Sequence, residues 1–177
     1  GTTDQVDVNF SVIEKPTGNI LLGAGFGSGT GVSLSGSIAQ QNIFGSGKHV
    51  SAQVNSSKIN TIYALSYTDP YFTVDGISQG FDVYSREIDG TRAAIGRYVT
   101  KTLGAGIRFG VPVTEFDTIS YGLAYENTEI TTFVDSPLFY QNYVTTFGNQ
   151  NDAIIGTVGW VRDGRDSLIY PTKGTLQ

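Results

Sequence analysis

Few residues of this chain have the types and spacing that enzyme or metal chemistry requires. The only histidine, His49, follows a glycine-containing turn at 45–48, and no nucleophile–base pair is recognisable around it. The chain has no cysteine, so it lacks thiolate ligands, cysteine nucleophiles and disulfides. No cluster of metal-ligating residues stands out. We therefore expect that the protein is not an enzyme and has no catalytic residue, no metal site and no cofactor.

Three other patterns have simple explanations. The alternating glycines of 23–27 resemble a phosphate-binding loop, but no helix is expected after them, so the nucleotide interpretation fails. The charged stretch 162–166 is typical of a strand end and turn. Arg108 and Glu126 are expected to face the same side of neighbouring strands, where they could pair. A polar interior tolerates such charges without any catalytic role.

The amino-acid composition excludes further classes of protein. Of 177 residues, 23 are glycine and only 15% are charged, and the formal net charge is -5. Such a balance argues against a nucleic-acid partner, whose phosphates would be repelled. No apolar run is long enough for a membrane-spanning helix, and no sustained helical periodicity is present.

Alternation with period two runs through the chain. In 20–26 the even positions are Ile, Leu, Ala and Phe, and the odd positions from 23 are glycine. The same alternation recurs in 32–38, 50–55, 102–111 and 119–126. This pattern predicts strands with one apolar face and one face of small or polar residues.

The polar face is rich in Gly, Ser, Asn and Gln, which is typical of a barrel lumen, whereas the apolar face suits lipid. We therefore predict an all-β, antiparallel transmembrane β-barrel segment of about eight strands, with a ninth beginning at 174–177, as part of a larger barrel. A soluble β-sandwich is the alternative. Compact turns at 40–47, 68–76 and 112–117 alternate with more variable connections at 86–98 and 131–150, as in outer-membrane barrels.

A boundary is expected near Pro16, because proline cannot continue a paired strand. Residues 1–15 would then form the last strand of a preceding domain, and 16–177 the N-terminal half of the barrel.

Four segments carry a family likeness, namely 5–15 with 17–18, Gln41–Gly47, Thr68–Gly76 with its Asp-Pro-Tyr-Phe core, and Tyr170–Gly174. In this order they resemble the BamA-type outer-membrane insertases, also called the bacterial surface antigen family. The likeness implies that residues 1–15 end a POTRA domain. It also implies that the N-terminus lies in the periplasm of a bacterium whose outer membrane holds the barrel.

The resemblance implies assembly and insertion of β-barrel proteins into the outer membrane. The implied partners are membrane lipid, unfolded barrel clients, accessory assembly lipoproteins and a second copy of the chain that would complete the barrel. Two alternatives stay open. One is a small self-closed or oligomeric structural barrel or pore, and the other is a two-partner-secretion-type transporter.

The family's working element is the first strand, which would pair with client strands as a lateral gate. Its glycines lower strand propensity independently of any resemblance, although they could simply relieve crowding in a curved barrel. A second candidate is the predicted periplasmic turn at 69–72, as a rigid turn or a docking site for soluble partners. The candidate residues are Asn19, Ile20, Leu21, Leu22, Gly23, Ala24, Gly25, Phe26 and Gly27, and then Asp69, Pro70, Tyr71 and Phe72.

Overall fold

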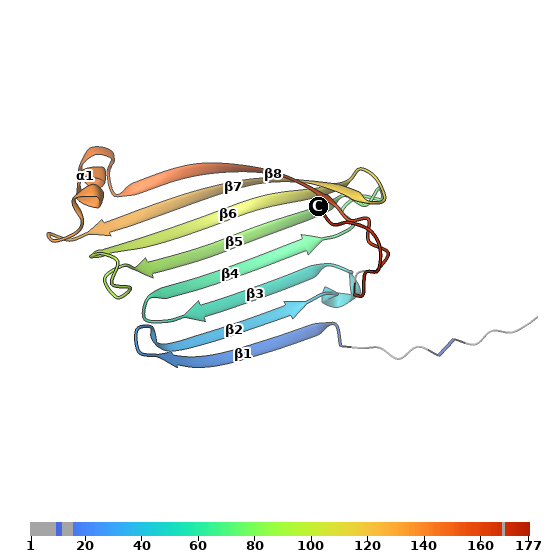
Figure 1. Cartoon of the computed structure of the whole chain (residues 1–177), viewed down its shortest axis with the longest axis horizontal. Helices are drawn as coiled ribbons and strands as arrows, with labels where there is room; N and C mark the ends of the chain where they lie inside the picture. The colour runs from blue at the N-terminus through green and yellow to red at the C-terminus, as the bar shows by residue number, and fades with distance from the viewer. Residues whose placement is uncertain (1–9, 12–15, 168) are drawn as a thin grey trace, which may run out of the picture.

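Eight strands form one antiparallel sheet in sequence order in the computed structural model (Figure 1), which describes residues 10–11, 16–167 and 169–177. This confirms the predicted all-β sheet of about eight strands. The elements are β1 (Gly18–Gly27), β2 (Gly31–Gln40), a 3₁₀ turn (Ile43–Gly45), β3 (His49–Ser56), β4 (Asn60–Asp69), β5 (Ser78–Asp89), β6 (Tyr98–Pro112), β7 (Asp117–Thr132), α1 (Leu138–Phe147) and β8 (Gln150–Arg162).

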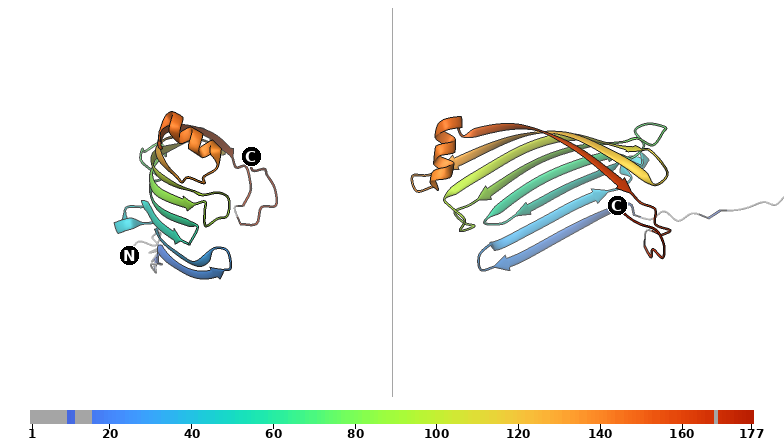
Figure 2. Two further views of the ribbon diagram at one scale, coloured as in Figure 1. Left: turned by 90° about the vertical axis from the view of Figure 1, so that its left-hand side faces the viewer. Right: turned by 45° about the horizontal axis from the view of Figure 1, so that its top comes forward.

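The sheet is a single curved layer that does not close (Figure 2). Each strand pairs with its sequence neighbour, so β1 and β8 lie at the two opposite edges. No helix in the described part of the chain is long and apolar enough to cross a membrane.

The strand registers place apolar side chains together on one face, which we call the apolar face. One complete row across the eight strands consists of Ile20, Ile38, Ala52, Leu65, Val83, Ala105, Tyr125 and Ile154. The opposite, polar face has rows such as Gly23, Ser35, Asn55, Ile62, Arg86, Thr102, Thr128 and Asn151. The alternation in the sequence therefore becomes two chemically distinct faces, because successive strand residues point to opposite sides.

No hydrophobic side chain is buried among the described residues, so the apolar face has no second layer over it. Leu22 and Phe26 on β1 are 86% and 81% exposed, and Val158 on β8 is 77% exposed. A soluble sheet would cover such a face with a second layer, whereas lipid can cover the wall of a barrel.

The connections β2–β3, β4–β5 and β6–β7 lie at one end of the sheet. The other end has the two shortest connections, β1–β2 and β3–β4, as well as β5–β6 and the longest one, β7–β8. Residues 86–89 belong to β5, so the expected connection at 86–98 is shorter than predicted. The expected start of a ninth strand is present only as a bridge between Asp163 and Leu176, with Arg162 N donating to Gln177 O at 3.0 Å.

The β7–β8 connection contains α1, which the sequence pattern did not predict. The helix has no regular apolar stripe and is held by contacts made outside it. Tyr140 stacks on Tyr98 of β6 with ring centroids 4.3 Å apart, and the hydroxyl of the buried Ser136, just before the helix, donates to Arg97 O in the β5–β6 connection. Tertiary contacts of this kind can stabilise a short helix that lacks periodicity.

Residues 1–15 were expected to end a preceding domain. This prediction rests on residues that lie almost wholly outside the described part of the chain.

Candidate functional site: the edge of the first strand

The first candidate element, Asn19–Gly27, lies entirely within β1 at one edge of the sheet (Figure 1). Within the described residues, β1 pairs only with β2, through a continuous register from Gly18–Gln40 to Gly27–Gly31. The other side of β1 is therefore a row of backbone N–H and C=O groups that can accept another strand. We call this row the β1 edge.

The hydrogen-bonding order of β1 identifies which residues present these groups. Gln41 N donates to Thr17 O at 3.0 Å, just beyond the Gly18–Gln40 pair, so Thr17 points its backbone groups toward β2. In an antiparallel ladder this orientation alternates, so odd residues bond to β2 and even residues face the β1 edge. The even residues are Ile20, Leu22, Ala24 and Phe26, whose side chains lie on the apolar face.

Glycines on the polar side of β1 face serines of β2. A methyl group on Gly23 would lie 2.6 Å from Ser35 Oγ, and one on Gly25 would lie 2.9 Å from Ser33 Oγ. The direct side-chain contact is weak, since Ser35 Oγ donates to Gly23 O at 3.5 Å. At the end of the ladder Gln40 Nε2 donates to Thr17 Oγ1 at 2.7 Å. Along the rest of the seam, the two strands are held mainly by their backbone hydrogen bonds.

The polar face of β4–β6 is different, because Arg108 connects three strands. Arg108 forms an ion pair with Asp82 of β5 and donates to Thr68 Oγ1 of β4 at 2.8 Å and to Ser66 Oγ at 3.1 Å. Its side chain crosses Gly80, where a methyl group would lie 2.6 Å from Arg108 Nε.

The expected pairing of Arg108 with Glu126 is wrong. The register places Arg108 opposite Gly122 and Glu126 opposite Gly104, so the two side chains lie on different rows. Glu126 instead accepts a hydrogen bond from the Tyr84 hydroxyl, and the Tyr84 ring crosses Gly104. The sequence alone could not show these two cross-strand contacts of Arg108 and Tyr84. The glycines at 80 and 104 within otherwise ordinary strands were, however, a signal that another group passes close to the backbone there.

The second candidate, residues 69–72, comprises the last residue of β4 and the start of the β4–β5 turn. Asp69 Oδ1 accepts from Tyr71 N at 3.2 Å, and its Oδ2 lies 3.1 Å from Lys48 Nζ in the neighbouring turn. The Tyr67 hydroxyl, and then the Asp69 carboxylate, raise the pKa of Lys48. These contacts support the rigid-turn role of Asp69 and Pro70, while Tyr71 and Phe72 stay exposed.

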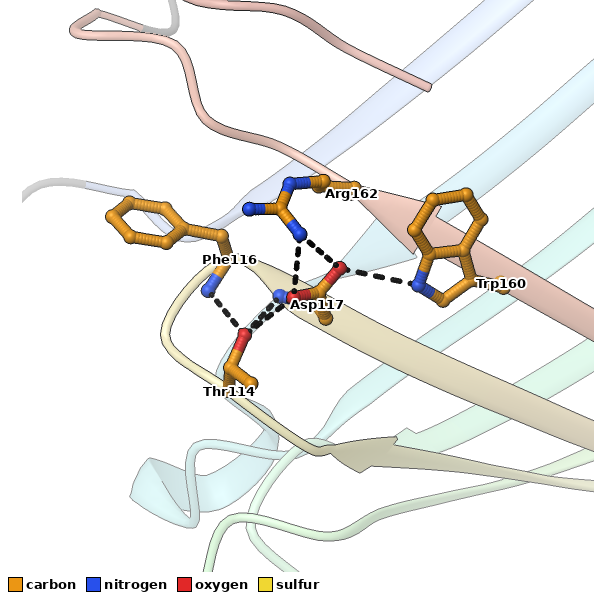
Figure 3. A network of polar contacts seen from close by, with 5 residues as sticks. All are labelled: Thr114, Phe116, Asp117, Trp160 and Arg162. Carbon is orange, nitrogen blue, oxygen red and sulfur yellow. Dashed lines mark hydrogen bonds and ion pairs between the residues drawn. The ribbon is translucent and has the colours of Figure 1, made fainter.

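Asp117 organises the β6–β7 turn and the end of β8 (Figure 3). It accepts from Trp160 Nε1 at 3.1 Å and Arg162 Nη1 at 3.3 Å, and from Thr114 Oγ1 at 2.6 Å. The same Thr114 Oγ1 accepts from Phe116 N at 3.2 Å. The sequence patterns did not single out this carboxylate, because its three partners come from two separate segments.

The carboxylates of the 162–166 stretch are each used locally. Arg165 Nη2 lies 2.7 Å from Asp163 Oδ2, and this hydrogen-bonded guanidinium lowers the pKa of Asp163 to about 2. Asp166 Oδ1 accepts from Thr172 N at 2.9 Å and Lys173 N at 3.1 Å. The Thr172 hydroxyl and these N–H groups lower the pKa of Asp166 to about 2. Both carboxylates therefore close turns, as the sequence predicted.

The remaining residues considered for catalysis, nucleotide binding or metal binding do not form a site with other residues. His49 is the exposed first residue of β3. The glycines of 23–27 lie inside a strand that turns into β2, which agrees with rejection of a phosphate-binding loop. No group of three or more His, Cys, Asp or Glu is placed to hold a metal ion in the described ranges.

Comparison with known proteins gives one consistent result. Residues 42–177 match the Omp85 superfamily domain. The chain is 40% identical to the outer membrane protein assembly factor BamA of Neisseria meningitidis serogroup B over 99% of its own length and 23% of the relative. It is 29% identical to BamA of Nitratidesulfovibrio vulgaris over 98% of this chain and 21% of that protein. It is 28% identical to the chloroplastic outer envelope protein 80 of Oryza sativa over 86% of this chain and 25% of that protein.

A solved structure agrees with these sequences. BamA from Haemophilus ducreyi, crystallised without POTRA domains 1–3, superposes with a TM-score of 0.68 at 29% identity, over 92% of this chain and 33% of that one. The chain thus spans less than a quarter of the length of the two BamA sequences and 33% of the crystallised chain, and its open sheet corresponds to part of a barrel. The resemblance to the BamA family is confirmed, and the chain belongs to the Omp85 superfamily.

Proposed function

We propose that this chain forms part of a machine that assembles β-barrel proteins into the bacterial outer membrane, and that client strands pair with the β1 edge. The relatives named BamA are outer membrane protein assembly factors, which supports the general activity. The observation that carries the role of β1 is its position at the edge of the sheet, with a single β-strand neighbour among the described residues.

The physical reason is the cost of an unpaired strand edge in lipid. Each backbone group left without a partner in hydrocarbon costs several kcal/mol, so the β1 edge favours capture of an incoming strand. The client strand can also be released again, because a strand of high glycine content has low β-propensity and offers few side chains to pack against a partner. Strand pairing of this kind involves no covalent chemistry and no cofactor.

The width of the apolar face supports a second contribution, local thinning of the membrane. On β1 the apolar positions run from Ile20 to Phe26, about 20 Å along the strand, and on β6 they run from Leu103 to Val111, about 27 Å. With a tilt of about 40°, the band on β1 spans only about 15 Å of membrane thickness. A band this short makes the bilayer thinner beside β1, which lowers the barrier to insertion.

In this proposal the polar face lines the lumen, the apolar face contacts outer-membrane lipid, and the N-terminus lies in the periplasm. The partners are unfolded barrel clients and accessory lipoproteins. A second chain or a further segment would complete the barrel beside β1.

Site-specific cross-linking in the natural-length protein tests the role of β1. Single cysteines replace Ile20, Leu22 or Ala24, and a short thiol cross-linker is added while a barrel client with scanned cysteines folds. The control is Leu65→Cys on β4, which lies in the same apolar row as Ile20 but is hydrogen-bonded on both sides. We expect client adducts at the β1 positions and none at position 65.

Absence of adducts at all three β1 positions would rule out client pairing at this edge. A parallel assay in liposomes separates the general function from the alternatives. Accelerated folding of an unrelated barrel client supports the assembly role, whereas ion conductance without accelerated folding indicates a pore.

A further inference from the structure

Two rows on the polar face share one arrangement, in which a long side chain crosses a glycine and bonds to the residue beyond it. In the first row Tyr84 on β5 lies opposite Gly104 on β6, which lies opposite Glu126 on β7. The Tyr84 hydroxyl donates to Glu126 across the glycine. The glycine is necessary, because a methyl group on Gly104 would lie 2.4 Å from Tyr84 Cζ.

The second row runs in the opposite direction with different side chains. Arg108 on β6 lies opposite Gly80 on β5, which lies opposite Thr68 on β4. Arg108 Nη2 donates to Thr68 Oγ1 at 2.8 Å, and a methyl group on Gly80 would lie 2.6 Å from Arg108 Nε. The arrangement therefore occurs at two places in this sheet, in each of which a hydrogen-bonding side chain reaches over a glycine to the second strand.

The β1 edge has two of the three members of such rows. Gly23 lies opposite Ser35, and Gly25 lies opposite Ser33. Each serine hydroxyl leans over its glycine, within 2.6 Å and 2.9 Å of where a methyl group would stand. A side chain on a strand paired to β1 needs to cross only about one strand spacing, ~4.8 Å, to reach these hydroxyls.

The alternation of hydrogen-bonded and non-hydrogen-bonded pairs along β1 favours a contact between the joining side chain and these serine hydroxyls. Even residues of β1 direct their backbone groups to the edge, so a joining antiparallel strand meets Gly23 and Gly25 as non-hydrogen-bonded pairs. In such pairs the Cα atoms approach to about 4.5 Å and side chains are closest. The side chain that lies across the glycine is therefore held near it.

We infer that the β1 edge selects strands whose residues opposite Gly23 and Gly25 are long and end in a neutral hydrogen-bonding group, with tyrosine and glutamine the best fits. This rests on the proposed function and specifies which strands the edge prefers. The neutral tip follows from the acceptors, because Ser33 and Ser35 are uncharged, whereas the guanidinium of Arg108 also pairs with the carboxylate of Asp82 in the neighbouring row. The same strand carries apolar side chains at the alternate positions, next to Leu22 and Ala24.

A peptide-binding experiment on the natural-length protein in phosphatidylcholine nanodiscs tests this selectivity. Four fluorescent ten-residue peptides alternate valine and serine and differ at one central serine position, which becomes Tyr, Gln, Phe or Ala. Fluorescence anisotropy measures the dissociation constant of each peptide. The Tyr and Gln peptides should bind about three- to tenfold more tightly than the Ala peptide, and the affinity of the Phe peptide should lie between that of the Ala peptide and that of the Tyr and Gln peptides.

Protein variants then identify the cause. Combined Gly23→Ala and Gly25→Ala should remove the preference while binding of the Ala peptide changes less than about twofold. The combined Ser33→Ala and Ser35→Ala variant should reduce the affinity for the Tyr peptide to the affinity for the Phe peptide. The control Gly29→Ala, in the β1–β2 turn where a methyl group meets no atom within 4 Å, should keep the preference.

Equal binding of the four peptides overturns the inference. It is also overturned if the glycine variants weaken all four peptides equally, since the glycines would then only shape the strand. A peptide cross-linked to Leu22→Cys but bound without selectivity refutes the inference and leaves the proposed function intact. If no peptide binds or cross-links at the edge, both are refuted.

Discussion

Substitution of Gly104 by alanine should destabilise the barrel, although alanine normally strengthens a strand. The added methyl group would lie 2.4 Å from Tyr84 Cζ and 2.6 Å from its hydroxyl oxygen. Because these atoms belong to a ring fixed by its bond to Glu126, the ring must rotate away and the hydrogen bond must break.

The magnitude follows from three contributions. A hydrogen bond to a carboxylate contributes about 1.5–3 kcal/mol, and moving the ring away from a favoured rotamer costs about 0.5–1.5 kcal/mol. The entropy gained by replacing glycine within a strand offsets about 0.5–1 kcal/mol. The net expectation is a loss of about 2 kcal/mol in the free energy of unfolding.

Urea unfolding of the natural-length protein in detergent micelles, followed by circular dichroism and by gel mobility, measures this loss. The matched control is Gly156→Ala on β8, where a methyl group meets no atom within 4 Å. That variant should be neutral or slightly more stable. In a Tyr84→Ala background, Gly104→Ala should cost less than about 0.5 kcal/mol, because the clash has been removed.

Equal effects of Gly104→Ala and Gly156→Ala would refute the steric reasoning. So would a full loss of stability by Gly104→Ala in the Tyr84→Ala background, since the ring would then not be the cause.

Two further predictions concern the turn end of the sheet. Asp117→Ala should cost about 1–2 kcal/mol and shift the NMR signal of the Trp160 indole N–H, which loses its acceptor, whereas Glu115→Ala in the same turn should leave that signal in place. Lowering the pH should open the turn that Asp166 closes. The pKa of Asp166 is lowered to about 2, so its contribution is fully present above the unfolded value of about 4 and is lost as the pH falls through about 2. The amide shift of Thr172 should therefore titrate near pH 2, and a midpoint near 4 would contradict the bonding described for Asp166.

The amino-acid sequence by itself determined the strands and their two faces. Period-two alternation depends only on the geometry of an extended chain, so Ile20–Phe26 could be read as one face without knowledge of any neighbour. Turns such as Asp69–Phe72 were equally legible, because the Asp69 carboxylate bonds to a backbone N–H two residues away.

Tertiary structure decided which side chains meet across strands. Arg108 and Glu126 looked like a pair because both belong to the polar face of neighbouring strands. Register separates them by row, and the glycines at 80 and 104 let each reach a different partner. A shift of register changes every such row without changing the sequence pattern, so the pattern alone cannot specify the partners.

The helix α1 shows the same limit. Its ten residues have no sustained apolar stripe, and Tyr140 is held by stacking on Tyr98, which lies forty-two positions earlier in the chain. Local alternation is encoded by neighbouring residues and is visible in the sequence. Contacts such as this one, and the side-chain bonds of Arg108 and Tyr84 across β4–β7, exist only once the strands are aligned.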